Sequence, residues 1–302
     1  MKYKRIYLIF SAVVLVPGLI SLIFFGLNLS IDFTGGSVFV YDVSQIEEKN
    51  QIEERMRNAF SQKEVEINEF VVGDDNVEVR THTIESQKND EINVILAADE
   101  ALLNINQKSF ETVGPSVGKE ATLNAFKALG MASLGIMLFI AYAFRNIPKP
   151  YSSIRFGVSA IIAMLHDAAL LVGIFSILGK VLGVEVDSLF ITAVLTVIGF
   201  SIHDSIVVFD RIRENLKKLP SSWDFDQVVN FSIVETLNRS FATSLTVLVT
   251  LLSLFILGGQ SIKYFVLALL IGILSGTYSS IFTASPILVM WEDHILKNRK
   301  KD

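Results

Sequence analysis

Six long apolar stretches constrain the fold of this chain more than any other feature of its 302 residues. A helix needs about 20 predominantly apolar residues to cross the hydrocarbon core of a bilayer. The stretches of that kind are 6–27, 126–144, 156–178, 188–209, 240–257 and 265–290. They predict a polytopic α-helical membrane protein with six transmembrane helices. The first stretch exceeds the ~7–15 apolar residues of a signal peptide and lacks an Ala-x-Ala site, so we expect it to be retained.

Basic residues predict the orientation of these helices. The short flanks on one side hold 15 Lys and Arg residues, whereas the opposite short loops hold only Lys180 and Lys263. Because Lys and Arg are enriched on the cytoplasmic side, both termini are expected in the cytoplasm.

The chain between the first two apolar stretches has a different composition. Residues 28–121 include 19 acidic and 8 basic residues and no long apolar run. We expect one acidic extracytoplasmic domain there. It would separate the N-terminus and first helix, 1–27, from the other five helices, 122–291, and a basic cytoplasmic tail would follow at 292–302.

The pattern within this domain alternates between strands and helices. Strands are predicted at 36–42, 64–72, 77–85 and 107–113, with a turn at 73–76. Helices are predicted at 44–60, which a capping box of Ser44 and Glu47 opens, and at 90–103. The order βαββαβ predicts a small ferredoxin-like α/β fold.

Ionisable residues inside the apolar stretches are the strongest functional candidates, because a charge at a helix centre costs ~2.5–3.5 kcal/mol on insertion scales. Asp167 follows His166, Asp204 follows His203, and Arg239 begins the fifth stretch. We interpret Asp204, Arg239 and Asp167 as ion-coupling residues. The alternative is structural, with carboxylates that hold helices together and an arginine that reaches to the interface. The histidines are interpreted as relay groups or as packed polar rings.

Two polar stripes support the coupling interpretation. Thr192, Thr196, Gly199 and His203 share one side of a helix, and Asp204 borders it. The second stripe consists of Arg239, Thr243, Thr246, Thr250 and Ser253. Together they predict a hydrated seam in which Asp204 pairs with Arg239. Aspartate can take a proton while arginine keeps its own, so such a pair is a candidate proton relay.

Composition and motifs argue against several other functions. The formal charge of −5 and the isoelectric point near 5.5 make nucleic-acid binding unexpected. Cysteine is absent, which excludes disulfides, cysteine zinc sites, iron–sulfur clusters and thiol nucleophiles. Neighbouring residues on a helix point about 100° apart, so neither His-Asp pair alone makes a metal site. We find no nucleotide-binding or hydrolase motif, and we predict neither an enzyme nor a metal or cofactor.

Four further segments have simpler interpretations. Asp-Phe-Thr-Gly-Gly at 32–36 reads as a turn, and 210–214 as a solvated, charged helix end. Residues 223–235 predict a short separate helix on the cytoplasmic interface. Small residues recur every fourth position at Gly272, Gly276, Ser280 and Ala284. This ridge favours close helix packing rather than chemistry.

Four segments together resemble the SecF family of bacterial protein-export membrane proteins. They are 32–36, Val-Gly-Pro-Ser-Val-Gly at 113–118, the stretch Ile-Gly-Phe-Ser-Ile-His-Asp-Ser-Ile through Arg-Ile-Arg-Glu-Asn at 198–215, and Leu-Asn-Arg-Ser-Phe-Ala-Thr-Ser at 237–244. The similarity runs in order along nearly the whole chain. The long motif at 198–215 is its most specific part.

The resemblance implies a function that composition did not show. It implies an RND-superfamily subunit of the bacterial cytoplasmic membrane that acts with a separate SecD protein. The pair would use the proton- or sodium-motive force in late steps of export of unfolded secretory polypeptides, in association with the SecYEG channel and with YajC and YidC. The coupling ion would be H⁺ or Na⁺, without another cofactor. An RND-type exporter of small molecules or lipids, and a passive scaffold of the translocon, are the alternatives.

The resemblance also implies roles for individual residues. It places the family's coupling carboxylate on Asp204 and its arginine on Arg239. The family's His-Asp falls on His166 and Asp167, and its cytoplasmic Asp-Arg on Asp210 and Arg211. We expect the ion-coupling residues to be supported by His203, His166, Asp210, Arg211 and Thr243. Structural motif positions fall on Asp32, Gly35, Gly36, Gly114, Pro115 and Gly118. His203 departs from the family, whose members often have Asn there, and this change is expected to alter the proton affinity of Asp204 or the choice of ion.

Overall fold

The computed structural model describes residues 3–46, 51–73, 75–99, 102, 105–220 and 222–299, with side chains as far as residue 295. It divides into two compact units. The membrane unit comprises Met1–Asn28 and Lys127–Asp302, and the α/β unit comprises Leu29–Phe126. The predicted fold class, six long apolar helices and one small α/β domain, is confirmed.

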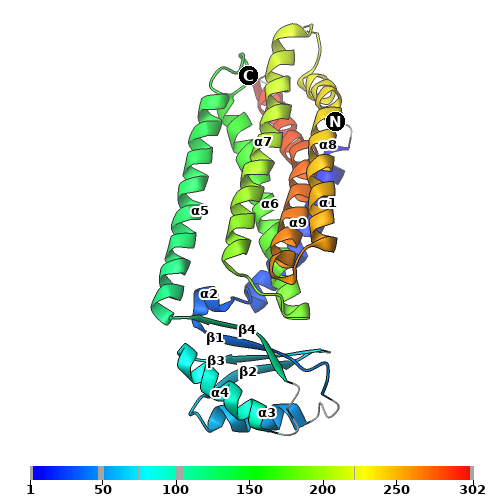
Figure 1. The fold of residues 1–302 in the computed structure, drawn as a ribbon. Coiled ribbons are helices and arrows are strands. Elements are labelled where there is room, and N and C mark those ends of the chain that lie inside the picture. Colours follow the sequence, from blue (N-terminus) through cyan, green and yellow to red (C-terminus); the bar gives the residue numbers. More distant parts are fainter. Residues whose placement is uncertain are drawn as a thin grey trace. The chain divides into compact units, whose positions relative to one another are not determined.

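Six helical segments are long and apolar enough to cross a membrane. The first five are α1 (Lys4–Phe25), α5 (Pro115–Ala143), α6 (Ser153–Leu182), α7 (Ser188–Lys218) and α8 (Phe225–Leu257). The sixth is composite: η3 (Gln260–Ile262), α9 (Lys263–Ser279), the π-helical η4 (Ser280–Ala284) and α10 (Ser285–Arg299). The two chain ends lie at the same end of the membrane unit (Figure 1), where Lys4 forms an ion pair with Asp293.

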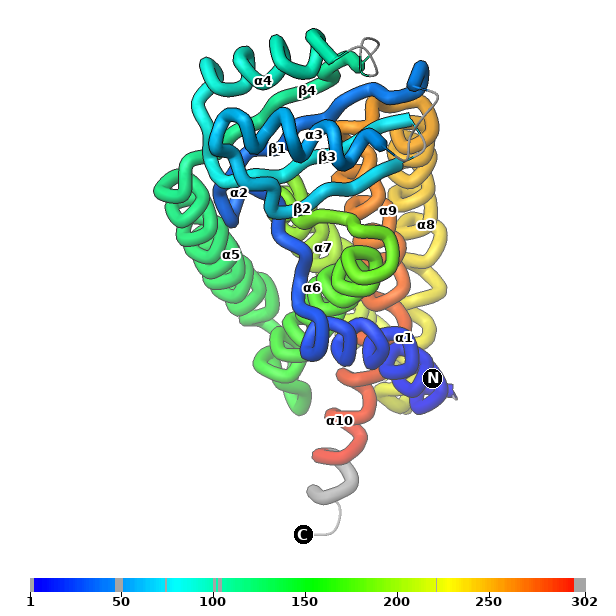
Figure 2. The backbone as a smooth tube through the Cα atoms, turned by 90° about the horizontal axis from the view of Figure 1, so that it is seen from below, coloured from blue at the N-terminus to red at the C-terminus, as the bar shows by residue number. Residues whose placement is uncertain are grey.

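The interior of the membrane unit is formed by α6, α7 and the sixth segment. In the most apolar part of each helix, 61% of residues are buried in the sixth segment but only 6% in α5. Figure 2 shows α1 beside α6 and α8 beside α9. Glycines permit the closest approaches. A Cβ on Gly18 would lie 2.9 Å from Gly173 Cα, and one on Gly272 would lie 2.1 Å from Val197 Cγ2. Close packing along the ridge that contains Gly272 is therefore confirmed.

The separate interfacial helix predicted at 223–235 is wrong. Helix α8 begins at Phe225 and continues without interruption to Leu257. A capping box of Asp224 and Gln227 starts it, and the Asp224 backbone N–H donates to Gln227 Oε1 at 3.0 Å. No Gly or Pro follows within α8, so nothing in the sequence ends the helix before the span begins.

The α/β unit contains the predicted βαββαβ order. Its elements are α2 (Ile31–Thr34), β1 (Gly36–Asp42), α3 (Ile52–Ser61), β2 (Ile67–Val72), β3 (Asn76–Thr81), α4 (Ser86–Ala98) and β4 (Asn106–Val113). The sheet order is β2-β3-β1-β4, and all neighbouring strands are antiparallel. Phe39 and Tyr41 of β1 pack with Met56 and Phe60 of α3 and Ile92 of α4 in the core.

Local differences from the prediction occur at element starts. Instead of capping a helix, Ser44 lies in a turn and donates its backbone N–H to Asp42 Oδ1 at 2.9 Å. Glu47 lies outside the described residues, as does Asp74 of the predicted turn. Hydrogen bonds from Ser44, together with one from Lys108, lower the pKa of Asp42 to about 2. The segment predicted as a turn at 32–36 contributes to the one-turn helix α2, which the Ser30 hydroxyl caps.

Candidate ion-coupling site

Asp167 lies at the junction of three helices and is completely buried. Its Oδ2 accepts hydrogen bonds from Ser201 Oγ of α7 at 2.6 Å and from Ser279 Oγ of α9 at 2.5 Å. Its Oδ1 accepts one from Ser275 Oγ of α9 at 2.6 Å. Three neutral hydroxyls from two neighbouring helices thus surround a carboxyl group of α6. We call Asp167 with Ser201, Ser275 and Ser279 the hydroxyl cage.

His166 flanks this cage on the same helix. Its Nδ1 lies 3.1 Å from Asp167 Oδ1, and its Nε2 is buried without a hydrogen-bond partner. His166 therefore contacts the hydroxyl cage through Nδ1, at Asp167 Oδ1.

Asp204 is buried on α7, with 5% of its surface exposed. Its Oδ2 accepts a hydrogen bond from Ser280 Oγ at 2.7 Å. Ser280 immediately follows Ser279 of the hydroxyl cage and begins the π-helical segment η4. Two consecutive serines of the sixth segment, Ser279 and Ser280, therefore donate hydrogen bonds to the buried carboxyl groups of α6 and α7.

The predicted pair of Asp204 and Arg239 is not formed. Asp204 bonds to Ser280 of η4, whereas Arg239 lies on an exposed face of α8. Within the described residues, no hydrogen bond or ion pair joins them. The two polar stripes also do not form the predicted seam between α7 and α8. Their threonine hydroxyls bond to backbone carbonyls of their own helices instead. Thr196 bonds to the Thr192 carbonyl and Thr243 to the Arg239 carbonyl.

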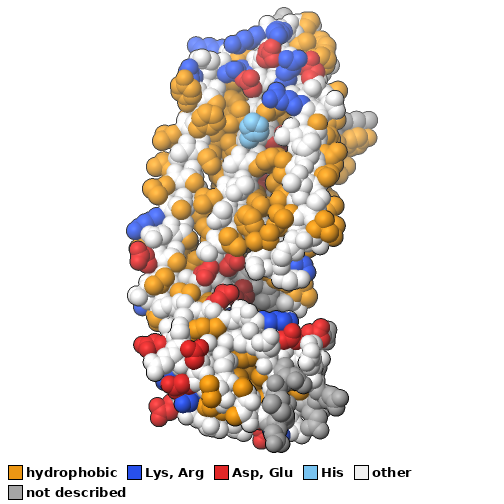
Figure 3. Space-filling view, viewed as in Figure 1, with side chains coloured by type: hydrophobic (Ala, Val, Ile, Leu, Met, Phe, Trp, Pro, Cys, Tyr) orange, Lys and Arg blue, Asp and Glu red, His pale blue; other side chains and the backbone are white. Residues whose placement is uncertain are grey.

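Both polar stripes instead lie on the surface of the membrane unit. On α7 the exposed members are Thr192, Thr196, Gly199 and His203. On α8 they are Arg239, Thr243, Thr246, Thr250 and Ser253. Figure 3 shows that a histidine and neutral, non-apolar side chains interrupt the apolar surface of this unit. We call these nine residues the exposed polar face.

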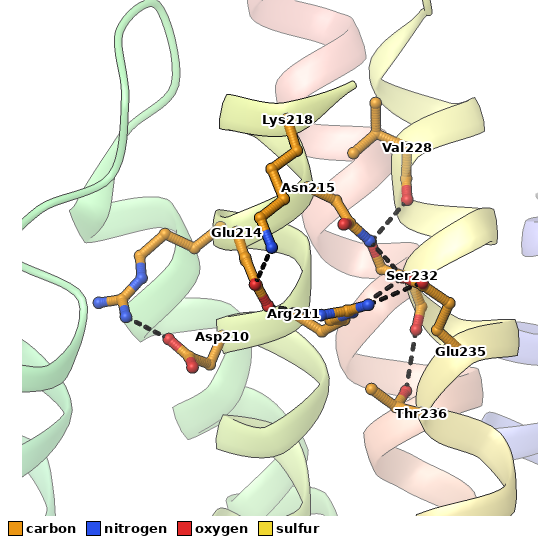
Figure 4. A network of polar contacts seen from close by, with 10 residues as sticks. Asp210, Arg211, Glu214, Asn215, Lys218, Val228, Ser232, Glu235 and Thr236 are labelled. Atoms are coloured by element: carbon orange, nitrogen blue, oxygen red, sulfur yellow. Dashed lines mark hydrogen bonds and ion pairs between the residues drawn. The ribbon is translucent and has the colours of Figure 1, made fainter. Parts of the chain in front are cut away.

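Charged residues at the C-terminal end of α7 form a separate network with the first turns of α8 (Figure 4). Arg211 donates from Nε and Nη2 to the two oxygens of Glu235, at 2.8 and 2.7 Å, and from Nη1 to Glu214 at 2.6 Å. Asn215 Nδ2 also bonds to Glu235, at 2.7 Å. Asp210 pairs with Arg213 rather than with Arg211. This end network is an inter-helix connection, and its position differs from that of the buried carboxyl groups.

Three residues of the site were missed in the sequence. Ser275 and Ser279 received no functional interpretation, and Ser280 was assigned to a packing ridge. The available signal was the run Ser-Gly-Thr-Tyr-Ser-Ser at 275–280, which carries five hydroxyl groups within six residues of an apolar span. Hydroxyls are common on membrane helices as local hydrogen-bond donors, so their number alone does not identify a partner.

Comparison with known proteins identifies the family. The family model described as "Protein export membrane protein SecD/SecF, C-terminal" matches residues 94–294, which is more than half of the chain. The model "SecD/SecF GG Motif" matches residues 20–45. The chain belongs to the SecD/SecF family. Among its residues, the first model covers both aspartates, Arg239 and the complete hydroxyl cage.

Individual SecD/SecF proteins agree with this assignment. The protein translocase subunit SecF of Thermobaculum terrenum is 45% identical, over 97% of this chain and 93% of the relative. The protein translocase subunit SecDF of Bacillus subtilis is 34% identical over 97% of this chain, which spans 38% of that longer relative. The crystal structure of SecDF, a translocon-associated membrane protein from Thermus thermophilus, has a TM-score of 0.79 and 33% identity. The aligned region covers 97% of this chain and 38% of the Thermus thermophilus chain.

The glycine motif of the SecD/SecF family has a clear local role. Gly35 and Gly36 have φ angles of 72° and 132°, which disfavour other residues. A Cβ on Gly35 would lie 3.0 Å from Pro115 Cα, and one on Gly118 would lie 2.9 Å from the Phe33 carbonyl oxygen. The two predicted motifs at 32–36 and 113–118 therefore pack against each other where β1 begins and α5 starts. Asp32 lies in α2, and the Gly114 carbonyl accepts from the Gly118 N–H at 3.0 Å.

Proposed function

We propose that this chain is the SecF subunit of a bacterial protein translocase and couples the proton-motive force to late steps of protein export. Asp204 would take up and release the coupling proton, and Asp167 would act with it. The observation that carries the proposal is the burial of Asp204 in the membrane unit with a neutral serine as its partner. Ionisable residues in such positions are costly and usually functional.

The names of the relatives and the surface of the membrane unit support SecD as a partner. SecD and SecF occur as one SecDF chain in Bacillus subtilis, so we propose that a separate SecD associates with this chain. The exposed polar face, which is unusual for a lipid-facing surface, would contact SecD, and Arg239 would find its partner there or after a rearrangement of α8. SecYEG, YajC and YidC are proposed as further partners in the cytoplasmic membrane, with both termini of this chain in the cytoplasm.

Export into inverted membrane vesicles tests the coupling. The vesicles contain this chain with its SecD, and ATP is held constant while the proton gradient is intact or collapsed. We expect the gradient to stimulate export with the wild-type chain and to have no effect with Asp204→Asn. The matched control is Glu120→Gln, which neutralises an exposed carboxylate on α5.

Two outcomes would contradict the proposal. Equal stimulation by wild type and Asp204→Asn would place coupling elsewhere. Export that does not respond to the gradient with either chain would favour a scaffold, unless a sodium gradient restores the difference, in which case sodium is the coupling ion. Co-purification with SecD shows in each case whether the variant still assembles.

A further inference from the structure

Ser279 and Ser280 connect the two buried carboxyl groups of the membrane unit. Ser279 donates to Asp167 on α6, and Ser280 donates to Asp204 on α7. The two serines are adjacent, and both are fully buried. Other hydroxyl groups of this segment bond elsewhere: Thr277 donates to Ser244 of α8, and Thr283 shares a hydrogen bond with Ser11 of α1. The contact with carboxyl groups is thus specific to Ser275, Ser279 and Ser280 in this segment, among the described residues.

Each of the two serines also has a second acceptor within reach. Ser279 Oγ lies 3.3 Å from the Gly276 carbonyl oxygen, and Ser280 Oγ lies 3.2 Å from the Thr277 carbonyl oxygen. A serine hydroxyl has one hydrogen to donate and two lone pairs that accept. Rotation about the Cβ–Oγ bond can therefore redirect the hydrogen from the carboxylate to the carbonyl, and the serine oxygen is then free to accept.

We propose that Ser279 and Ser280 are paired hydroxyl switches, which keep Asp167 and Asp204 hydrogen-bonded in both protonation states and link the two protonation events. This inference rests on the proposed coupling function and adds Asp167 as a second protonation site. The serines are positioning residues, since the proton itself would reside on the carboxyl groups.

The chemical change at Asp204 balances with one proton from water. The proton binds to Oδ2 and forms the carboxyl O–H. The hydrogen bond from Ser280 to Oδ2 breaks, the serine hydrogen turns to the Thr277 carbonyl, and the new carboxyl O–H donates to Ser280 Oγ. Release of the proton reverses each step. The same exchange at Asp167 involves Ser279 and the Gly276 carbonyl.

The hydrogen bonds around Asp167 favour a proton over a metal cation at this position. Both oxygens of Asp167 already accept hydrogen bonds from hydroxyls, at distances of 2.5–2.6 Å. Oxygen atoms this close leave no room between them for a metal ion. His166 on α6 is the other titratable group in contact with Asp167, α7 contributes Asp204, and the contacts from α9 and η4 are neutral hydroxyls.

The π-helical segment η4 gives a physical reason why protonation of Asp167 and protonation of Asp204 would be linked. Short π-helical turns within α-helices occur often at functional sites. Here the turn begins at Ser280, directly after Ser279, and the Ser285 hydroxyl donates to the Ser280 carbonyl at 3.2 Å. Because the two serines are consecutive, a rotation of this segment that withdraws one hydroxyl from its carboxyl group displaces the other as well. Protonation of one aspartate would then alter the hydrogen bonding of the second.

Infrared difference spectroscopy on the complex with SecD in proteoliposomes tests this inference. The C=O bands of protonated Asp167 and Asp204 are assigned by their loss in Asp167→Asn and Asp204→Asn, and are followed as the pH is changed. We expect Ser280→Ala to shift the midpoint of the Asp204 band by about one pH unit or more, because the hydrogen bond to the charged carboxylate is stronger than the one to the neutral carboxyl group. Ser279→Ala is expected to shift the Asp167 band, and each variant to move the other band by a smaller amount.

Two further variants separate a switch from a structural role. Ser280→Thr retains the hydroxyl and is expected to restore the wild-type midpoint, including when Ser280→Ala lowers the yield of complex. Ser176→Ala removes a buried hydroxyl that bonds to Ser21 and to the Gly26 carbonyl, away from both carboxyl groups, and is expected to leave both bands unchanged. Unchanged midpoints in Ser279→Ala and Ser280→Ala would overturn the inference, as would a band that does not titrate in wild type.

Failure of the proposed coupling function would be seen in the export assay rather than in the infrared bands. In that case wild-type export would be insensitive to the proton gradient, whatever the carboxyl bands do. If the gradient drives export but the serine variants leave both bands unchanged, the coupling function stands and the hydroxyl switches are excluded.

Discussion

Helix α7 has two polar faces with opposite environments. One face carries Ser201 and Asp204, which are buried and bond to residues of α6 and η4. The other face carries Thr196 and His203, which are exposed. The difference indicates that residues of this chain supply hydrogen bonds to the buried carboxyl groups of Asp167 and Asp204, whereas the exposed polar face is available to contact a partner protein. Variants on the buried face should therefore change folding or proton affinity, and variants on the exposed face should change function in the complex.

Among variants of the exposed polar face, the largest functional effect is expected at Arg239. Arg239→Lys keeps the charge but loses the planar fork of the guanidinium group, which binds a carboxylate through two parallel hydrogen bonds. We expect about a tenfold loss of gradient-dependent export, in line with about 1.5–3 kcal/mol for a hydrogen bond to a charged group. The assay is export into vesicles that contain SecD.

Chain stability provides the contrast for this variant. Because Arg239 has no ion pair within the described residues, its replacement should leave the thermal unfolding of the purified chain unchanged. Arg145→Lys, at an exposed arginine after α5, is the control and should keep wild-type export. Wild-type export by Arg239→Lys would remove the argument for a forked pair with a partner.

The second largest effect is expected on the buried side of α7, at its contact with α9. A Cβ on Gly272 would lie 2.1 Å from Val197 Cγ2, so Gly272→Ala requires the two helices to move apart. Overpacking of this kind costs about 1–3 kcal/mol of stability. Thermal unfolding of the purified chain in detergent measures the change.

A compensating variant makes this prediction specific. Val197→Ala removes the two methyl groups in the way and should recover most of the stability lost in Gly272→Ala. Gly135→Ala, on α5, is the control because no atom lies within 4 Å of its Cβ position. A loss of stability in Gly272→Ala that Val197→Ala does not recover would show that the ridge does not determine the packing of α7 on α9.

The sequence was sufficient for the architecture because each element depends mainly on local pattern. Apolar stretches of membrane length predicted all six helices, and alternation predicted β1 at 36–42 with its observed bounds. Element starts were less accurate. A capping box and an Asx turn use the same residue types, so Ser44 did not reveal that it would bond to Asp42.

The candidate site was predictable only in part, for a related reason. Buried charge identified Asp167 and Asp204, since few apolar spans tolerate an aspartate. The partners of these aspartates depend on how α6, α7 and α9 rotate about their axes. The stripe on α7 correctly gathered Thr192, Thr196 and His203 on one face, but sequence periodicity cannot say whether that face points inward. The hydroxyls that were placed in a seam are exposed, whereas Ser280, which was placed in a packing ridge, donates to Asp204.

A smaller effect is expected in the end network of α7 and α8. Glu235→Gln removes one carboxylate from the bidentate pair with Arg211, and both side chains are about one-third exposed, at 29% and 33%. Screening by solvent reduces the value of such pairs, so we expect a loss of at most about 1 kcal/mol in stability, smaller at high salt. Thermal unfolding at two ionic strengths measures it.

The control for the end network is Asp210→Asn. Its ion pair with Arg213 lies within α7 and does not join two helices. Asp210→Asn should therefore destabilise the chain less than Glu235→Gln does. Equal effects would mean that the network does not hold the end of α7 against α8.

The smallest effect is expected for single hydroxyls on the exposed polar face, and it separates the two faces most directly. Among the described residues, the Thr196 hydroxyl bonds to the Thr192 carbonyl of its own helix, so Thr196→Val should leave the stability of the chain alone within about 0.5 kcal/mol of wild type. Hydrogen bonds between membrane helices average about 0.6 kcal/mol, which predicts about a threefold weaker complex with SecD.

Thr277→Val, whose hydroxyl bonds to Ser244 in the interior at 2.7 Å, should show the reverse: a less stable chain with unchanged affinity for SecD. Binding of labelled SecD in detergent and thermal unfolding give the two numbers, and identical behaviour of the two threonine variants would mean that the two faces of the bundle do not differ in the way their exposure indicates.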